Sequence, residues 1–308
     1  MALPCRILIL LATYNGQTWL KDQIDSVLNQ EGVQVQVLVS DDCSTDHTVE
    51  IVTTFTQTDS RVRMVSCDRK FGSAGRNFLS LLTKADLTHT DYVAFCDQDD
   101  VWLPNKLSTA VQILNSSGAH GYSCAVRAVW PDGREKVISQ VSSQRSSDFI
   151  FEGAGQGCTF VMTKEFLLRA QLFIQKNQED NLNLHYHDWL MYILARAWSM
   201  SWHFDTRPWI IYRQHGNNEI GARGSLSSIT YRLKKIKNGW YLTQIQSAFD
   251  IYKLAGGDNL NTILIGNIIN SSKSLKRRFL LIQKLAKHSR RRKSDRLVLV
   301  LTAMLGWL

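Results

Sequence analysis

The chain has 308 residues, of which 44% are hydrophobic and 20% charged, with 18 Gly and only 4 Pro. This composition excludes collagen, low-complexity disorder and a coiled coil, and the length suits one large domain with or without an appendage. The formal net charge of +9 is unevenly placed, since residues 1–222 carry 19 basic and 24 acidic side chains and residues 223–308 carry 17 and 3. An acidic body with a strongly basic C-terminal region predicts that this region meets something anionic.

Strand and helix patterns alternate through the first hundred residues. The predicted strands are residues 6–12, 33–39, 61–66 and 91–96, and the predicted helices lie around residues 20–28, 46–55 and 72–85. This order predicts a parallel sheet covered by helices. The carboxyl ends of its strands then lie along one edge, where such sheets bind ligands.

The pattern changes after residue 100. The sequence predicts a short helix that begins at Pro104, a hairpin, a strand followed by a helix to about residue 175, a further helix, two short strands, and basic helices beyond about residue 225. The hairpin joins 122–130 to 134–139, the strand is 158–163, the helix is 187–197 and the short strands are 201–204 and 209–212. No apolar run reaches the roughly 18 to 20 residues that span a bilayer. The six Cys, none within four residues of another, are interpreted as buried, reduced thiols of a cytosolic protein.

Three carboxylates follow the predicted strand 91–96, in the stretch Asp97-Gln98-Asp99-Asp100. Carboxylates crowded at a strand end repel one another unless a cation is present. In extended chain, Asp97 and Asp99 point the same way and can converge on one ligand. Oxygen donors favour Mg²⁺ or Mn²⁺. The alternative interpretation is a solvated turn that caps the next helix.

Two further turns follow predicted strands. Asp41 begins the polar run 41–46, and a carboxylate there can accept the imide N–H of uracil or thymine. The same run can instead serve only as a helix cap, through Ser44 or Asp46. The turn 13–16, at the end of the first strand, can line a nucleotide base or be an ordinary connection.

Two stretches nearer the C-terminus carry His beside other chemistry-bearing residues. In 185–189, Asp188 fits a general base or a helix cap, and the two His at i and i+2 do not share a helix face. In 212–218, Arg213 and His215 precede a Gly turn and can hold phosphate or a metal, or belong to a surface loop.

Taken together, these motifs resemble a family 2 glycosyltransferase with a GT-A fold. The resemblance covers residues 5–222 and consists of A-T-Y-N-G, S-D-D-C-S-T-D, C-D-Q-D-D-V-W and H-D-W, in that order. The later Y-R-Q-H-G-N-N resembles bacterial rhamnosyltransferases of O-antigen or capsule assembly. The resemblance implies an α/β, Rossmann-like catalytic domain over residues 1–222. Its sheet is mixed but mainly parallel and is flanked by helices, and a basic helical extension follows over residues 223–308.

The resemblance also implies roles for single residues. The nucleotide and donor side comprises Thr13, Tyr14, Asn15, Asp41, Arg76, Asp97, Gln98 and Arg213. The metal ligands are Asp99, Asp97 and His215, and the general base is Asp188. The acceptor or sugar side comprises Trp102, Gln156, Gly157, His187 and Trp189. Cys43 departs from the family pattern, since many relatives carry Gly or Asn at this position.

The implied reaction is metal-dependent, inverting transfer of a sugar to a hydroxyl of a polyprenyl-linked or polysaccharide acceptor. The favoured donor is dTDP-rhamnose, and a UDP-hexose is the alternative. A nucleotidyltransferase is a further alternative, although no Gly-rich phosphate loop with an adjacent Lys is present. A nucleic-acid-binding protein would explain the basic C-terminal region but not the acidic strand end, and we expect no nucleic-acid partner.

The C-terminal region has two parts. Residues 272–296 contain eleven Lys or Arg and one acid, and residues 297–308 are mostly apolar. Twelve residues are too few to span a bilayer but enough to insert into its interface. The sequence therefore predicts peripheral attachment to the anionic inner face of the cell membrane. A solvated basic helix with a docked C-terminal helix, or docking to a partner protein, are the alternatives.

Overall fold

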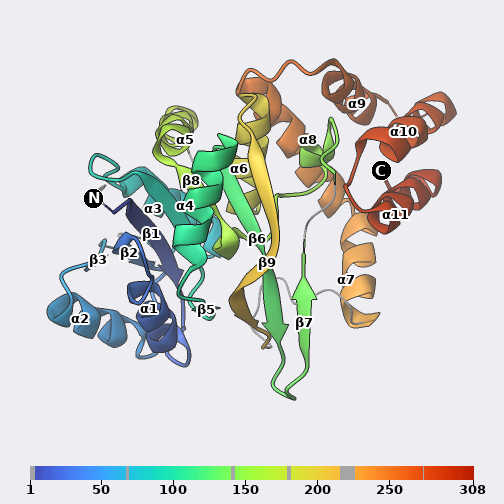
Figure 1. Ribbon diagram of the computed structural model, residues 1–308. Helices are drawn as coiled ribbons and strands as arrows, with labels where there is room; N and C mark the ends of the chain where they lie inside the picture. Colours follow the sequence, from blue (N-terminus) through green and yellow to red (C-terminus); the bar gives the residue numbers. More distant parts are fainter. Residues whose placement is uncertain (1–3, 67–68, 140–142, 179–181, 216–225, 273) are drawn as a thin grey trace.

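The computed structural model describes residues 4–66, 69–139, 143–178, 182–215, 226–272 and 274–308. In these ranges nine strands form one sheet, with the order β3-β2-β1-β4-β8-β6-β9-β5 and with β7 paired to β6 (Figure 1). The strands are β1 (Arg6–Thr13), β2 (Gln34–Asp41), β3 (Val62–Met64), β4 (Tyr92–Cys96), β5 (Val101–Trp102), β6 (Gly121–Val129), β7 (Glu135–Ile138), β8 (Val161–Thr163) and β9 (Trp202–Arg213).

Helices surround this sheet and continue to the C-terminus. Those before β9 are α1 (Leu20–Leu28), α2 (Thr48–Thr58), α3 (Ala74–Lys84), α4 (Lys106–Ser117), α5 (Lys164–Asn177) and α6 (His187–Ala197), with the 3₁₀ turns η1 (Asp148–Ile150) and η2 (Gly157–Thr159). Those after β9 are α7 (Leu226–Lys237), α8 (Trp240–Leu254), α9 (Leu260–Asn270), α10 (Leu275–His288) and α11 (Lys293–Met304).

The N-terminal half of the sheet is parallel, as predicted. β1 lies between β2 and β4 and runs parallel to both, and β3 runs parallel to β2. The register pairs Thr13 with Asp41 and Leu11 with Cys96. The carboxyl ends of β1, β2 and β4 therefore open on the same edge of the sheet.

The second half of the sheet differs from the prediction in two places. Residues 202–213 form one strand instead of two, and its parallel register with β6 shifts between Cys124 and Arg127. Pro208, which has no backbone N–H, pairs inside this irregular stretch, and a bulge accommodates such a residue. The predicted strand 158–163 is confirmed only over β8, because residues 157–159 form the η2 turn.

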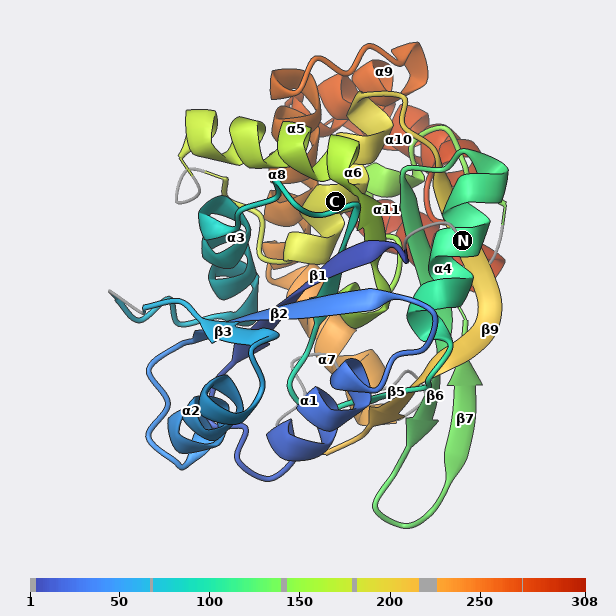
Figure 2. The same ribbon diagram turned by 60° about the vertical axis from the view of Figure 1, so that its left-hand side comes forward.

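The two faces of the sheet carry different helices because successive side chains of a buried strand point to opposite sides. Ile7 and Ile9 of β1 pack in the apolar cluster that includes α1, α2 and α4. Leu8 and Leu10 pack in the cluster that includes α3, α5 and α6. Figure 2 shows α1 and α2 on one side of β1 to β3, and α3 and α5 on the other. The predicted fold class, a helix-covered mixed sheet with C-terminal helices, is confirmed.

The C-terminal helices join the second cluster. Tyr241, Phe249, Leu285 and Leu299 belong to the same apolar cluster as β1 and α6. The predicted boundary between residues 222 and 223 lies in residues 216–225, outside the described part. None of the described helices combines the length and the apolar character needed to cross a membrane.

Candidate active site

The acidic cluster follows β4 in a turn, not in extended chain. Residues 97–100 lie between β4 and β5 without strand pairing, so the i, i+2 alternation that placed Asp97 beside Asp99 does not apply. Possible ligand atoms of Asp97, Asp100 and Cys158 all lie within 4.8 Å of one another. Asp99 points elsewhere, with its Oδ2 2.8 Å from His215 Nε2. The structure thus pairs Asp97 with Asp100, and Asp99 with His215.

Asp100 is the most confined of these carboxylates. It is fully buried, and neither of its oxygens has a hydrogen-bond partner among the described residues. Burial, together with the charges of Asp99 and Asp97, raises its pKa well above the ordinary value. An orphaned carboxylate beside two others is the arrangement that a bound cation would satisfy.

The donor atoms fit a hard divalent cation. Burial raises the pKa of the Asp99 carboxyl, an effect that His215 opposes. Burial also raises the pKa of the Cys158 thiol well above its ordinary value, so this sulfur stays protonated and is a poor ligand. The remaining donors are carboxylate oxygens with one imidazole nearby, a set that suits Mg²⁺ or Mn²⁺.

The end of β9 brings positive charge to this cluster. Arg213 Nη2 lies 2.8 Å from Asp22 Oδ2 of α1, and its guanidinium lies 4.9 Å from the centre of the Trp19 ring. The His215 ring stacks with the same Trp19 ring, and the two ring centroids lie 6.0 Å apart. Trp19 therefore supports both basic residues. Apart from its place in the turn after β1, nothing in the sequence pattern marks Trp19 as part of the site.

Gln98 holds the backbone of the turn that follows β1. Its Oε1 accepts from Tyr14 N at 2.8 Å, and its Nε2 donates to Tyr14 O at 2.9 Å. A Cβ on Gly16 would lie 2.2 Å from Gln98 Oε1, which explains the glycine there. Both polar atoms of this amide are engaged with Tyr14, and the predicted donor contact of Gln98 stays a prediction.

Asp41 is likewise engaged inside the protein. Its Oδ1 accepts from the hydroxyls of Thr13 at 2.8 Å and Ser44 at 2.6 Å, and its Oδ2 accepts from Ser44 N at 2.8 Å. The side chain is buried and joins the ends of β1 and β2. The predicted base contact of Asp41 stays a prediction.

The neighbouring carboxylate, Asp42, was not singled out from the sequence. It accepts from the backbone N–H groups of Phe71 and Gly72, at 2.8 Å for the second, and so fixes the loop before α3. Lys70 of this loop lies 3.1 Å from the Tyr14 hydroxyl and 4.6 Å from the centre of its ring. Asp42, Tyr14 and Lys70 therefore bring polar groups together at the strand ends.

Two residues of these turns adopt positive φ. Asn15 has φ 47° and accepts from Thr45 N through its Oδ1 at 2.8 Å. Cys43 has φ 58°, in the left-handed region that Gly and Asn enter most readily. The backbone conformation at position 43 therefore favours the Gly or Asn of the family pattern, and this chain has Cys there instead.

Helix α3 follows this loop. Ser73 caps it by accepting from Arg76 N, and the Arg76 side chain is exposed in the first turn. Asn77 Nδ2 donates to Ser40 O at 3.0 Å, which fastens α3 to the end of β2. The predicted nucleotide-side position of Arg76 stays a prediction.

Asp188 stands in the first turn of α6, half-buried, with its Oδ1 accepting from Trp189 N at 2.6 Å. The η2 turn lies against it, since a Cβ on Gly157 would lie 3.3 Å from Asp188 Cβ and 2.7 Å from His187 Nε2. Gln156 precedes this turn and is half-buried. Because Cys158 of the same turn reaches Asp97 and Asp100, η2 connects the acidic cluster to Asp188.

Three residues expected on the sugar side are buried instead. His187 stacks on Phe78 with ring centroids 4.0 Å apart, and burial lowers its pKa to about 3, so it is neutral. Trp189 is buried and donates from Nε1 to Phe149 O at 2.6 Å. Trp102 is buried under the Lys106 ammonium, which lies 3.5 Å from the centre of its ring. All three side chains therefore pack inside the protein, and the sugar-side role expected of them stays a prediction.

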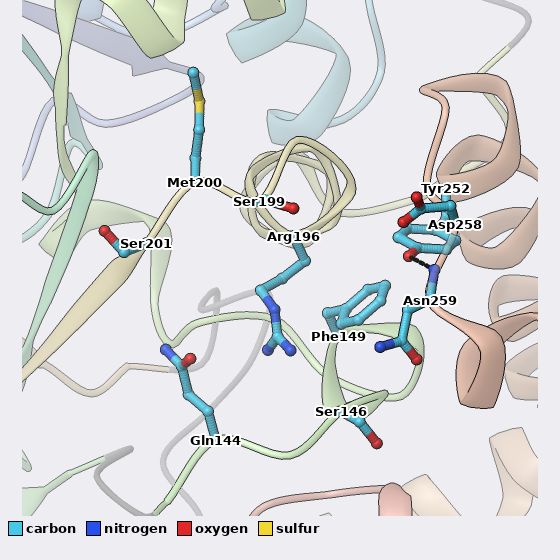
Figure 3. Close-up of a pocket in the computed structure, with 10 residues that line it drawn as sticks. All are labelled: Gln144, Ser146, Phe149, Arg196, Ser199, Met200, Ser201, Tyr252, Asp258 and Asn259. Carbon is cyan, nitrogen blue, oxygen red and sulfur yellow. Dashed lines mark hydrogen bonds between the residues drawn. The ribbon is translucent and has the colours of Figure 1, made fainter.

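A second concavity lies elsewhere. A cavity of about 330 Å³ is lined by Arg196 of α6, Tyr252 of α8 and Ser201, among others. Figure 3 shows these lining residues. Ser201 lies just before the start of β9, whereas Arg213 ends this strand and His215 lies just after it. Arg196 is already bonded to Asp148 at 2.7 Å. This cavity is therefore separate from the acidic cluster.

Comparison with known proteins agrees with this geometry. The model of the family "Glycosyl transferase family 2" matches residues 8–180. The dTDP-rhamnosyl transferase RfbG of Shigella flexneri is 37% identical over 264 residues, which are 84% of this chain and 91% of the relative. A GalNAc(5)-diNAcBac-PP-undecaprenol beta-1,3-glucosyltransferase of Campylobacter jejuni is 31% identical over 54% of each chain.

Solved structures support the fold. TarS of S. aureus in complex with UDP-GlcNAc has a TM-score of 0.55 at 15% identity, covering 91% of this chain and 80% of that one. A mannosyltransferase of Pyrobaculum calidifontis in complex with GDP-Man and Mn²⁺ has a TM-score of 0.50 at 17% identity, covering 97% and 86%. These likenesses show the GT-A fold. With more than half of the chain matched by the family model, and with a relative similar over most of both lengths, this chain belongs to glycosyl transferase family 2.

Proposed function

We propose that the chain transfers L-rhamnose from dTDP-rhamnose to a hydroxyl of a lipid-linked or polysaccharide acceptor during synthesis of a bacterial surface glycan. The observation that carries this proposal is the approach of Asp97 and Asp100 to Cys158 of the η2 turn, a turn that also lies against Asp188. The similarity to RfbG over 84% of the chain supports the donor. Relatives whose names contain diphosphoundecaprenol or PP-undecaprenol support a polyprenyl-linked acceptor.

The nucleotide would lie over the carboxyl ends of β1 and β2. Tyr14 and Lys70 present an aromatic ring and a cation there, and Asn15 shapes the turn. Backbone groups of Tyr14 are held by Gln98, so the base-side turn and the acidic cluster share one support. Arg76 and Arg213 supply positive charge on either side of the diphosphate.

Asp97, Asp99 and Asp100 would hold Mg²⁺ or Mn²⁺, which when bound supplies positive charge to the leaving diphosphate. His215 orients Asp99 through its 2.8 Å contact. Arg213, which like His215 rests on Trp19, adds fixed positive charge at the same place. The protein side of this site therefore stabilises negative charge that grows as the sugar–phosphate bond breaks.

Asp188 would act as the general base of an inverting reaction. The acceptor oxygen forms a bond to the anomeric carbon while the bond to the diphosphate oxygen breaks on the opposite face. Asp188 takes the proton of the acceptor hydroxyl as this happens, and the nucleoside diphosphate leaves. One carboxylate on the acceptor side is sufficient for inversion. His187 is a poor candidate for this role, because its ring is buried against Phe78 and a pKa of about 3 makes it a weak base.

The donor is tested by calorimetric titration of dTDP, UDP and GDP into the purified protein, with and without Mn²⁺. We expect Mn²⁺-dependent binding of dTDP above that of the other two, followed by release of dTDP from dTDP-rhamnose when a diphosphate-linked acceptor is added. Preference for UDP would replace the donor with a UDP-hexose. Release of pyrophosphate from a nucleoside triphosphate would instead favour a nucleotidyltransferase.

A further inference from the structure

Helices α10 and α11 form an antiparallel hairpin at one side of the molecule, far from α2 and β3 (Figures 1 and 2). Arg277 Nη1 at the start of α10 donates to Leu308 O at 3.1 Å, and Arg278 Nη1 donates to Met304 O at 3.4 Å. The start of α10 therefore lies beside the end of α11. Both helices bury one side, through Leu281 and Leu285 of α10 and Leu299 of α11.

The opposite side of the hairpin is apolar and exposed. The exposed fractions are 81% for Leu275, 62% for Phe279, 59% for Leu297, 48% for Leu301, 54% for Met304 and 61% for Leu305. We call these six residues the hairpin face. Three of them lie on α11 and Leu305 is its C-cap, and these four recur at helical spacing, so they share one stripe. Large apolar side chains gathered in this way mark an interaction surface.

The charged residues around the hairpin face indicate what kind of surface it binds. The arginines of the hairpin are used inside the protein: Arg277 donates to Ile268 O, Arg291 pairs with Asp148, and Arg296 donates to Arg290 O. The lysines stay outside, with Lys276, Lys287 and Lys293 exposed. Among the described residues of α10 and α11, Asp295 is the single acid, and it lies 3.7 Å from Arg290.

We propose that the hairpin face rests on an anionic lipid bilayer, with its apolar side chains in the interface and its lysines at the headgroups. Neither helix is long enough to cross, since α10 has 14 residues and α11 has 12, against about 20 for a span. A second copy of the chain is a poorer occupant, because a symmetric contact would bring two positive faces together. The contact itself follows from the hairpin face, while the need for it rests on the proposed lipid-linked acceptor.

The test is co-sedimentation of the full chain with vesicles of phosphatidylcholine, with and without a third of phosphatidylglycerol. We expect binding to the anionic vesicles, weakened by salt. Phe279→Ser combined with Leu301→Ser should abolish most of it, and Lys276→Glu should reduce the partition coefficient at least about five-fold. Leu172→Ser and Lys176→Glu on α5 are matched controls, since both positions are exposed on another helix, and should bind as wild type.

Three results would overturn the proposal. They are no binding of the wild type to anionic vesicles, equal binding of the double Ser variant, and a wild-type dimer that the double Ser variant converts to monomer without a change in vesicle binding. The proposed function is tested separately, by measuring sugar transfer to a water-soluble, short-chain acceptor. That activity should be unchanged in the double Ser variant, and Asp188→Asn, which is expected to lack it, should still bind vesicles.

Discussion

Asp188 places a carboxylate in the first turn of α6, beside a turn that reaches the acidic cluster. Asp188→Asn keeps the size of the side chain and an oxygen for Trp189 N, but it cannot take a proton. We expect folding and dTDP binding to be kept and kcat to fall by about 10²–10⁴. Steady-state kinetics together with calorimetry check this, with the exposed Asp132→Asn as control. Near-wild-type kcat would remove Asp188 from the role of base.

The buried Asp100 allows a sharper test of the metal site. Asp100→Asn removes a carboxylate that has no hydrogen-bond partner and lies near two others, so the metal-free protein should be at least as thermally stable as the wild type. The same change should weaken Mn²⁺ binding by at least about ten-fold, because a ligand is lost. Thermal unfolding with and without Mn²⁺ measures both effects. A full Mn²⁺-induced rise in Tm in this variant would exclude Asp100 as a ligand, and Asp99→Asn tests the alternative set with His215.

At the residue scale, the sequence predicted the type of site better than its pairing. Three acids after an apolar strand indicate a cation whatever the local backbone. Which of them meet depends on the turn 97–100, and that turn is set by the antiparallel pairing of β5 with β9, a long-range contact. Asp41 shows the same limit, because its hydrogen bonds to Ser44 and Thr13 depend on two strands lying side by side.

At the element scale, the η2 turn is the connection between the two halves of the site. A Cβ on Gly157 would lie 2.7 Å from His187 Nε2, and this ring is held between Phe78 and Phe95. Gly157→Ala should therefore displace the first turn of α6, cost about 1–3 kcal/mol of stability and reduce kcat more than donor affinity.

The matched control for that change is Gly153→Ala in the same loop, where the nearest atom would be Trp189 Cα at an ordinary 3.4 Å. Urea denaturation and kinetics of both variants make the comparison. Equal behaviour of the two would mean that η2 does not position Asp188. The sequence could not reveal η2, because 158–163 is as apolar as a strand, and the turn forms where residues 156–159 meet the end of β4.

At the scale of the whole molecule, some basic residues of the C-terminal region form ion pairs inside the protein. Arg291 Nη1 lies 3.2 Å from the buried Asp148, and Arg291 N donates to Glu152 at 2.6 Å. Arg291→Met should cost about 3 kcal/mol, because it leaves buried acid without part of its countercharge. We expect one cooperative transition with a lower midpoint, measured by urea denaturation.

The control for this prediction is Arg134→Met, since Arg134 pairs with Asp132 at the surface and such pairs contribute about 0–1 kcal/mol. Two separate transitions in the wild type would instead mean that residues 226–308 fold independently. For the same reason, removal of residues 273–308 does not test membrane contact alone. Net charge indicated an anionic partner, but it could not distinguish the arginines that pair internally from the lysines that stay outside.

The contact of Gln98 with both backbone groups of Tyr14 joins the loop that carries the acids to the turn after β1, over which the nucleotide would lie. A cation that orders the first loop therefore also orders the second. Thermodynamic reciprocity then requires that the nucleotide raise the affinity for the cation by the same factor by which the cation raises the affinity for the nucleotide. Substrate and cofactor would thus recruit each other, and the enzyme would hold its cation most firmly when a donor is present.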